Sequence, residues 1–315
     1  MIGIEWTAEE RAVFEKLDMA NPVHRAEFDL YWLSKLHHTD PDFLVAVTRD
    51  ALSVLDQHNP SKARQWREIL RQHAPGIVPP AVARFWDRFG DRTWSGDAVR
   101  RIPAPEPLVA GVLDRGQTSL LVAPSGLGKT FVGLSLGYAI AGGHDWFDHE
   151  VTAPGPVFYF LGEGVSGAGV RSDAWARFHN RSIPAAFNLV GAAPDLSDGA
   201  VIADLIAWAA DVRPAFVVFD TLARVSGTFD ESNPVHMTRL MSVGAELGRF
   251  GTHTMFVHHT GKSNEGYRGS SALYGAADAV LSLFPSRDAV DGRFSMAFTK
   301  RKDGDQGLYI PFELN

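Results

Sequence analysis

The sequence predicts an α/β protein in which a mostly parallel sheet carries helices on both faces, preceded by a small all-helical N-terminal domain. Two observations predict this fold class. Helix-capping residues precede apolar residues at helical spacing in the first 90 residues, and short apolar strands alternate with helical segments in the rest of the chain. Because 315 residues exceed what one hydrophobic core usually serves, we expect two domains, residues 1–92 and residues 93–315.

Helix starts are clearly marked in the N-terminal domain. Three pairs place a capping residue before a proline, which is favoured at the first helical position. The pairs are Asn21-Pro22, Asp40-Pro41 and Asn59-Pro60. Thr7 and Glu10 have the spacing of a capping box and mark a fourth start. Apolar residues after these starts fall on single helical faces, which predicts a small helical bundle.

The pattern changes near residue 92, where we place the domain boundary. Prolines at positions 103, 105 and 107 predict an extended approach to the second domain. Beyond them, apolar segments predict strands at residues 118–123, 157–162, 216–220, 254–258 and 279–284. A hairpin of residues 294–300 and 308–312, turning at Asp303-Gly304, is expected at the edge of the sheet.

Composition limits the partners and the compartment. The chain has no cysteine, which excludes disulfide frameworks, zinc ribbons and thiol nucleophiles. The N-terminus lacks both a signal-peptide pattern and a long apolar span, so we expect a cytoplasmic protein that has no membrane contact. A net charge of -7 argues against a broadly basic surface, and any contact with DNA is therefore expected to be local.

A phosphate-binding loop is the strongest signal in the sequence. An apolar strand, residues 119–123, runs into a glycine-rich turn that a helical segment follows, which is the context such a loop requires. The turn consists of Pro124, Ser125, Gly126, Leu127, Gly128, Lys129 and Thr130. We expect its backbone N–H groups to surround the phosphates of ATP, Lys129 to reach the β- and γ-phosphates, and Thr130 to bind Mg²⁺. Ala123 replaces the usual first glycine, a mild departure at a position that ends the strand.

Polar residues follow three other predicted strands at the same edge of the sheet. Asp220 ends an apolar strand and is expected to hold Mg²⁺, through water. Glu163 stands between two glycines and is the candidate general base that polarises the attacking water. His259 is the predicted sensor of the γ-phosphate, with the adjacent His258 as the alternative.

A glycine-rich and partly basic segment follows His259. Its residues Lys262 and Arg268 are candidates to bind the phosphates of single-stranded DNA. The other interpretation is an ordinary surface loop.

The order of these motifs, with the phosphate loop followed by Glu163, Asp220 and His259, is that of RecA-like ATPases. More closely, the chain resembles the RepA-type hexameric replicative helicases of plasmids and phages over about residues 94–315. The resemblance is carried by residues 123–130, 161–164, 220–224, 258–262 and 268–273. It implies a RecA-like fold, ATP bound between the subunits of a hexameric ring, and ATP-driven 5′ to 3′ movement along single-stranded DNA. It also implies a DNA-facing segment at residues 262–268 and a second one at residues 223–236.

The chain departs from that family at one position. Asp278 stands where RepA places an arginine that acts on the neighbouring subunit. Lys300 and Lys302 resemble instead the lysine pair by which RecA reaches a neighbour's ATP, and we assign them this role as a hypothesis. The alternative is a basic hairpin tip. A site completed by a neighbour predicts a homo-oligomer.

The sequence leaves open the role of the N-terminal domain and two alternative functions. The N-terminal domain could bind a primase or initiator protein, dock on a neighbouring subunit or brace the ring. The alternative enzyme to a helicase is a RecA-like recombination or annealing ATPase, which would form filaments on DNA. The third interpretation is a regulatory ATP-dependent switch whose N-terminal domain binds protein and whose negative charge keeps it away from DNA.

Overall fold

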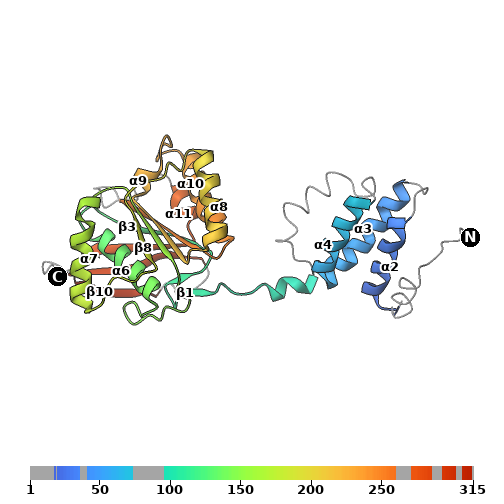
Figure 1. The fold of residues 1–315 in the computed structure, drawn as a ribbon, viewed down its shortest axis with the longest axis horizontal. Coiled ribbons are helices and arrows are strands. Elements are labelled where there is room, and N and C mark those ends of the chain that lie inside the picture. The colour runs from blue at the N-terminus through green and yellow to red at the C-terminus, as the bar shows by residue number, and fades with distance from the viewer. Residues whose placement is uncertain are drawn as a thin grey trace, which may run out of the picture. The chain divides into compact units, whose positions relative to one another are not determined.

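The computed structural model describes residues 18, 20–35, 41–73, 96–259, 271–285, 293–302 and 307–313 (Figure 1). The chain divides into two compact units, Met1–Ala104 and Pro105–Asn315, which we call the N-terminal unit and the ATPase unit. The boundary predicted near residue 92 lies outside the described residues.

The described part of the N-terminal unit is helical. It contains α2 (Pro22–Lys35), α3 (Pro41–His58), α4 (Pro60–His73) and the short 3₁₀ helix η2 (Gly96–Arg101). The three helix starts predicted at prolines are confirmed. Asn21 accepts a hydrogen bond from the backbone N–H of Val23 at 2.9 Å, as a capping residue does. Leu30, Leu55 and Leu70 are fully buried between the helices. The predicted capping box at Thr7 and Glu10 lies outside the described residues.

In the described part of the ATPase unit, eight strands form one sheet in the order β10-β9-β8-β3-β7-β6-β4-β5. Their bounds are β3 (Thr118–Ala123), β4 (Val157–Leu161), β5 (Phe187–Val190), β6 (Phe216–Asp220), β7 (His253–His259), β8 (Ala279–Pro285), β9 (Arg293–Arg301) and β10 (Tyr309–Glu313). Pairing is parallel from β8 across to β5, whereas β9 and β10 form an antiparallel edge. Strands β1 (Pro107–Val109) and β2 (Leu113–Asp114) form a separate antiparallel pair.

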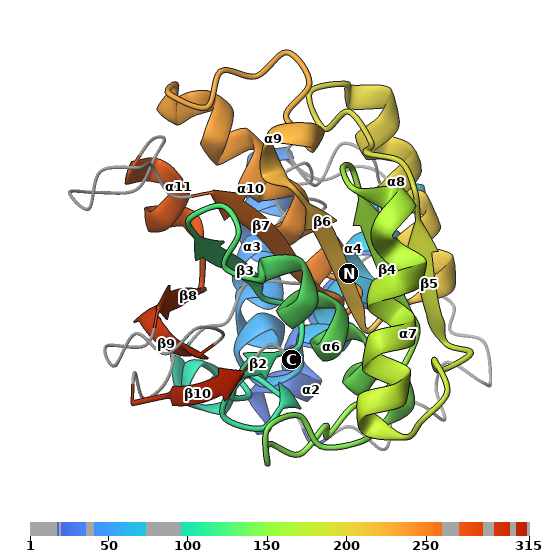
Figure 2. The same ribbon diagram turned by 90° about the vertical axis from the view of Figure 1, so that its left-hand side faces the viewer.

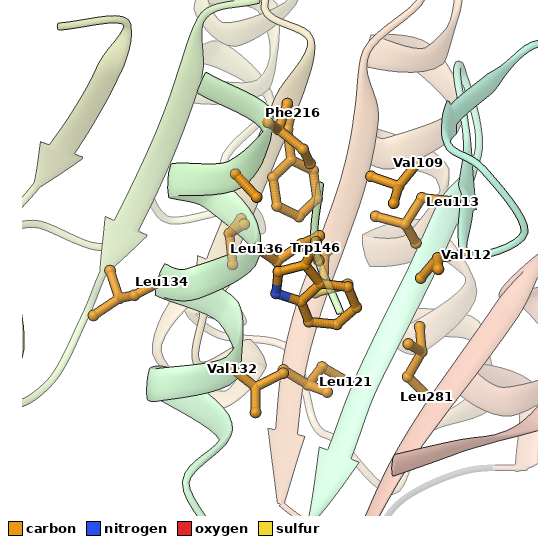
Figure 3. Close-up of a cluster of buried hydrophobic side chains, with 14 of the residues drawn as sticks. Val109, Val112, Leu113, Leu121, Val132, Leu134, Leu136, Trp146, Phe216 and Leu281 are labelled. Atoms are coloured by element: carbon orange, nitrogen blue, oxygen red, sulfur yellow. The ribbon is translucent and has the colours of Figure 1, made fainter. Parts of the chain in front are cut away.

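Helices cover both faces of the sheet, as Figure 2 shows. One face carries α6 (Lys129–Gly142) and α7 (Ala168–His179); the other carries α8 (Gly199–Val212), α10 (Pro234–Gly248) and α11 (Ser271–Ala276). Successive residues of β3 point to opposite faces, so Leu121 joins the first core and Leu120 the second. Figure 3 shows Leu121 beside Val132 of α6 in the first core, with Trp146 between α6 and the strands.

This arrangement confirms the predicted fold class, a RecA-like α/β fold with a mostly parallel sheet. The five predicted core strands and the edge hairpin are all present, although the turn predicted at Asp303-Gly304 lies outside the described residues. The sequence analysis missed β5, a four-residue strand at the far edge whose side chains are only partly buried or exposed. Among the described residues, no helix is long and apolar enough to cross a membrane.

Candidate functional site: a phosphate loop at the carboxyl edge of the sheet

The phosphate loop lies between the buried strand β3 and helix α6, where the sequence predicts it. Gly126 and Gly128 have φ angles of 86° and 79°, in the left-handed region that favours glycine. A side chain at Gly126 would contact no atom within 4 Å, so the loop needs glycine there for its backbone conformation and not for space. Helix α6 begins at Lys129, which directs its N-terminal N–H groups toward the loop.

The ammonium group of Lys129 is buried and bound to the loop itself. Its Nζ donates to the carbonyl oxygens of Ala123 and Pro124, both at 2.9 Å, and lies 2.9 Å from Nδ1 of His259. Burial lowers the pKa of Lys129 to about 8, while the carboxylates of Asp220 and Glu163 oppose this shift. Lys129 is therefore mostly charged at neutral pH, and a phosphate oxygen would replace one of these neutral partners.

Asp220 accepts two short hydrogen bonds at the end of β6. The hydroxyl of Thr130 donates to Oδ2 at 2.8 Å, and the hydroxyl of Tyr159 donates to the same oxygen at 2.7 Å. Burial raises the pKa of the Asp220 carboxyl above its ordinary value, and these two hydrogen bonds act in the opposite direction. The carboxylate and the Thr130 hydroxyl thus face one point, as two oxygen ligands of a hard cation do.

These two oxygens fit Mg²⁺ bound together with a nucleotide. Mg²⁺ commonly takes one or two protein oxygens and completes its coordination with phosphate oxygens and water. Among the described residues, no group of three or more His, Cys, Asp or Glu side chains could hold a metal ion alone. Thr130 and Asp220 therefore provide a partial site that suits Mg-ATP better than a free ion.

Glu163 follows β4 and contacts two side chains from the segment that follows β6. The hydroxyl of Thr221 donates to Oε1 at 3.0 Å, and Arg224 lies 3.6 Å from Oε2. The Glu163 side chain is 43% exposed, so water reaches it. A side chain at Gly162 would lie 2.6 Å from Cβ of Arg224, so the glycine before Glu163 leaves room for this contact.

His259 ends β7 beside the phosphate loop, and its register places it opposite Ala123. Burial and the nearby Lys129 ammonium lower the pKa of its ring. The ring is therefore neutral at pH 7, so its Nδ1 can accept a hydrogen bond from the Lys129 ammonium. His258 is 3% exposed and lies in the preceding position of the strand, with its side chain toward the other face. Both histidines line a cavity of about 480 Å³ with Thr221, Ala223 and the acidic residues near position 230.

Lys300 and Lys302 lie elsewhere in the fold. Lys300 is opposite Val280, near the start of β8, whereas the phosphate loop follows the other end of the parallel strands. Its Nζ donates to the carbonyl oxygens of Tyr274 and Gly275 at 2.6 and 2.8 Å. Burial, with a smaller effect of Lys302, lowers the pKa of Lys300. Both cations thus sit at the C-terminal end of α11, where the helix dipole favours positive charge.

Asp278 has a clear contact within the chain. Its Oδ2 accepts a hydrogen bond from the backbone N–H of Thr118 at 2.9 Å, and Oδ1 pairs with Lys302 at 2.9 Å. The carboxylate therefore links the start of β3 to Lys302, the residue that follows β9.

The structure thus brings the phosphate loop, Asp220, Glu163 and His259 together and leaves Lys300 and Lys302 apart from them. The predicted DNA-binding residues Lys262 and Arg268 lie outside the described residues. The second predicted DNA-facing segment, residues 223–236, places Asp230 and Glu231 at the 480 Å³ cavity.

Three contacts of the site were not predicted from the sequence. Tyr159 stands two residues before Leu161, which pairs with Asp220, so its hydroxyl shares a face of the sheet with the carboxylate. Strand alternation could have revealed this contact once the β4–β6 register was known. Thr221 and Arg224 belong to a segment that carried the family resemblance, but the sequence analysis assigned no role to either residue.

Comparison with known proteins adds one match. The model of a family described as an AAA domain matches residues 86–265, which is more than half of the chain. No curated protein matches the chain.

Proposed function

The chain belongs to the AAA domain family of P-loop ATPases, and from this premise we propose that it is a RepA-type motor that hydrolyses Mg-ATP to move along single-stranded DNA. The observation that carries the proposal is the convergence of Lys129, Thr130, Asp220, Glu163 and His259 at one edge of the sheet. Each has the chemistry that one step of ATP hydrolysis needs.

Binding of the nucleotide uses the phosphate loop and α6. The glycine-rich backbone and the helix N-terminus attract the phosphates, and Lys129 neutralises charge on the β- and γ-phosphates. Thr130 and Asp220 would hold Mg²⁺, which would supply positive charge to the phosphates when bound. The energy of the Lys129 contacts to Ala123 and Pro124 offsets part of the new phosphate contact.

We assign Glu163 as the general base of ATP hydrolysis. Its carboxylate accepts a proton from the attacking water while the water oxygen bonds to the γ-phosphorus. The bond from the γ-phosphorus to the bridging oxygen then breaks, and that oxygen leaves on ADP. Thr221 and Arg224 hold the carboxylate in place from one side.

The coupling to DNA starts at His259. Its neutral ring touches Lys129, so loss of the γ-phosphate changes the contacts of both residues. Lys262 and Arg268 stand three and nine positions after His259 in the sequence. A strand of DNA bound by these two cations would therefore be joined to the nucleotide site by a few residues of backbone.

Assembly into a hexameric ring is part of the proposal. Lys300 and Lys302 do not reach the phosphate loop of their own chain, which agrees with a role at a neighbour's site. They would have to exchange the carbonyl groups of α11 for phosphate oxygens. We assign recruitment of a primase or initiator protein to the helical N-terminal unit.

One observation favours a second candidate, a regulatory ATPase switch that binds protein. Asp230 and Glu231 line the cavity beside His259, and the chain carries a net charge of -7. Negative charge at this place would repel DNA phosphates.

The steady-state rate of ATP hydrolysis, measured with and without single-stranded DNA over a series of salt concentrations, separates the two. Lys129→Ala serves as the blank for contaminating ATPases. A DNA motor shows a stimulation that falls as salt rises, because phosphate contacts release counterions. An assembled and active protein whose rate ignores DNA favours the switch. Filaments on DNA in electron micrographs, without directional unwinding, would favour a recombination ATPase.

A further inference from the structure

A second cavity lies beside α6, away from the carboxylates of the site above. It measures about 370 Å³, within the roughly 300–1,000 Å³ typical of small-molecule sites. We call it the α6–α7 cavity, because residues of these two helices form most of its wall. Its aromatic lining consists of Phe131, Trp146, Phe147, Trp175, Phe178 and Phe312. Three of these rings, at positions 131, 147 and 178, are 42%, 41% and 71% exposed, which is more apolar surface than isolated exposed residues explain.

The cavity extends along α6 away from the phosphate loop. Its near end is Phe131, the residue after Thr130, and its wall continues down α6 to Ala139. At 1.5 Å per residue, Ala139 lies about 15 Å along the helix from Lys129. Trp175 packs at this level, with its ring 4.7 Å from that of Tyr138. A ligand seated against Trp175 would therefore occupy different space from the phosphates of ATP.

Two ring nitrogens in the wall of the cavity lack hydrogen bonds. Nε2 of His144 and Nε1 of Trp175 are buried and have no partner in the described part of the chain, and the two ring centres are 5.8 Å apart. A buried polar atom left without a partner destabilises the fold, so such atoms are uncommon without a functional reason.

The two nitrogens offer opposite hydrogen-bonding roles. Burial and the charge of Arg181 lower the pKa of His144, so the ring is neutral at pH 7. The ring bonds to the backbone of Gly142, which leaves the lone pair of Nε2 as an acceptor. The indole N–H of Trp175 is a donor. Together they match the edge of a planar heterocycle that presents one donor and one acceptor.

Charge at the cavity argues against an anionic ligand. Among the residues that the structure describes, the cavity lining carries the carboxylates of Asp145 and Glu313 and contains no lysine or arginine, while Arg181 lies nearby and acts on His144 and His179. Phosphate groups would be repelled there.

We propose that the α6–α7 cavity binds an uncharged planar nitrogen heterocycle of nucleobase size, separately from the nucleotide at the phosphate loop. The heterocycle stacks between the aromatic side chains and pairs with His144 and Trp175 once their rings turn the two buried nitrogens toward the cavity. Because the cavity follows α6 from Phe131, its occupant contacts the same helix that begins at Lys129.

Calorimetric titration of the full chain with adenine, hypoxanthine and cytosine, without ATP, tests the proposal. At least one base is expected to bind both the wild-type protein and Lys129→Ala. Ala174→Trp fills the cavity from an exposed position of α7 and should abolish binding. Ala207→Trp, at an exposed position of α8, is the matched control and should retain it. Trp175→Phe keeps an aromatic ring without the N–H donor and should weaken binding about three- to tenfold.

Competition separates this site from a base-binding part of the ATP site. Inorganic triphosphate fills the phosphate loop without a base. If ATP displaces the bound base and triphosphate does not, the cavity holds the base of ATP itself and the separate site is refuted. Binding of none of the three bases, or equal loss in Ala174→Trp and Ala207→Trp, refutes the proposal as well.

Discussion

Removal of one hydroxyl, in Tyr159→Phe, should shift the pH dependence of ATP hydrolysis. Tyr159 donates to Oδ2 of Asp220 at 2.7 Å, and this hydrogen bond favours the ionised carboxylate. A hydrogen bond to a charged group contributes roughly 1.5–3 kcal/mol, and 1.36 kcal/mol corresponds to one pKa unit. Its loss should therefore raise the pKa of Asp220 by about 1–2 units above a value that burial already raises. Because only the ionised carboxylate holds Mg²⁺ well, the acidic limb of kcat/KM should move up by the same amount.

The assay is a pH profile of kcat/KM for ATP at saturating Mg²⁺. Well above the limb, where the carboxylate is ionised in both proteins, the rates should approach each other. Tyr138→Phe is the matched control, because its buried hydroxyl bonds to Ser172 and not to Asp220. An acidic limb that stays in place in Tyr159→Phe, or moves equally in Tyr138→Phe, would refute the reasoning.

Three further variants test other parts of the site. Glu163→Gln should bind ATP, measured by calorimetry, but lose turnover about 10²–10⁴-fold. Thr221→Val should keep ATP binding and lose less turnover, because it removes only the hydrogen bond that positions the glutamate. Normal turnover in Glu163→Gln would contradict the assignment of Glu163 as the base. Asp220→Asn should raise the Tm of the nucleotide-free protein at pH 7. Because the folded-state pKa of Asp220 is raised, the stability linked to its protonation is present below about pH 4 and is lost as pH rises through the folded-state pKa. Asparagine does not ionise, so the variant does not lose this stability. An unchanged or lower Tm at pH 7 would contradict it. Lys300→Ala should lower turnover and reduce the rate of wild-type subunits in mixed assemblies, and full activity in the mixture would remove Lys300 from a role at the neighbour's site.

Much of the fold was predictable because strong local signals agreed with the tertiary structure. The helices at Pro22, Pro41 and Pro60 begin where capping residues and prolines place them. The buried strands are continuous apolar runs, as parallel strands covered on both faces require. Strand β5 lacked such a signal, because its position at the edge leaves its side chains only partly buried or exposed.

The site was predictable where the chemistry is local in sequence. The phosphate loop needs two glycines, a lysine and a threonine in adjacent positions, and all of them occur together. The Tyr159 contact depends instead on the register between β4 and β6, which no local pattern fixes. Gly133 shows the same dependence, because a side chain there would lie 2.8 Å from the Tyr159 hydroxyl that must reach Asp220.

The lysines near the C-terminus illustrate a different limit. The sequence analysis assigned Lys300 and Lys302 to a neighbour's ATP, with a basic hairpin tip as the alternative. In the structure, the antiparallel return of β9 places both lysines against the end of α11. This environment follows from the tertiary fold and not from the spacing of the two residues. Their role at a neighbouring subunit remains a prediction.

In the proposed mechanism, the nucleotide at the phosphate loop controls the affinity for single-stranded DNA. Measuring this affinity in two nucleotide states tests the mechanism most directly. Fluorescence anisotropy would measure Kd for a labelled oligonucleotide with ADP and with a nonhydrolysable ATP analogue, at one fixed salt concentration. A coupling of 1–3 kcal/mol is typical, so we expect Kd values that differ about 5- to 150-fold between the two states. Equal Kd values, or no DNA binding in either state by a protein that hydrolyses ATP, would contradict the account.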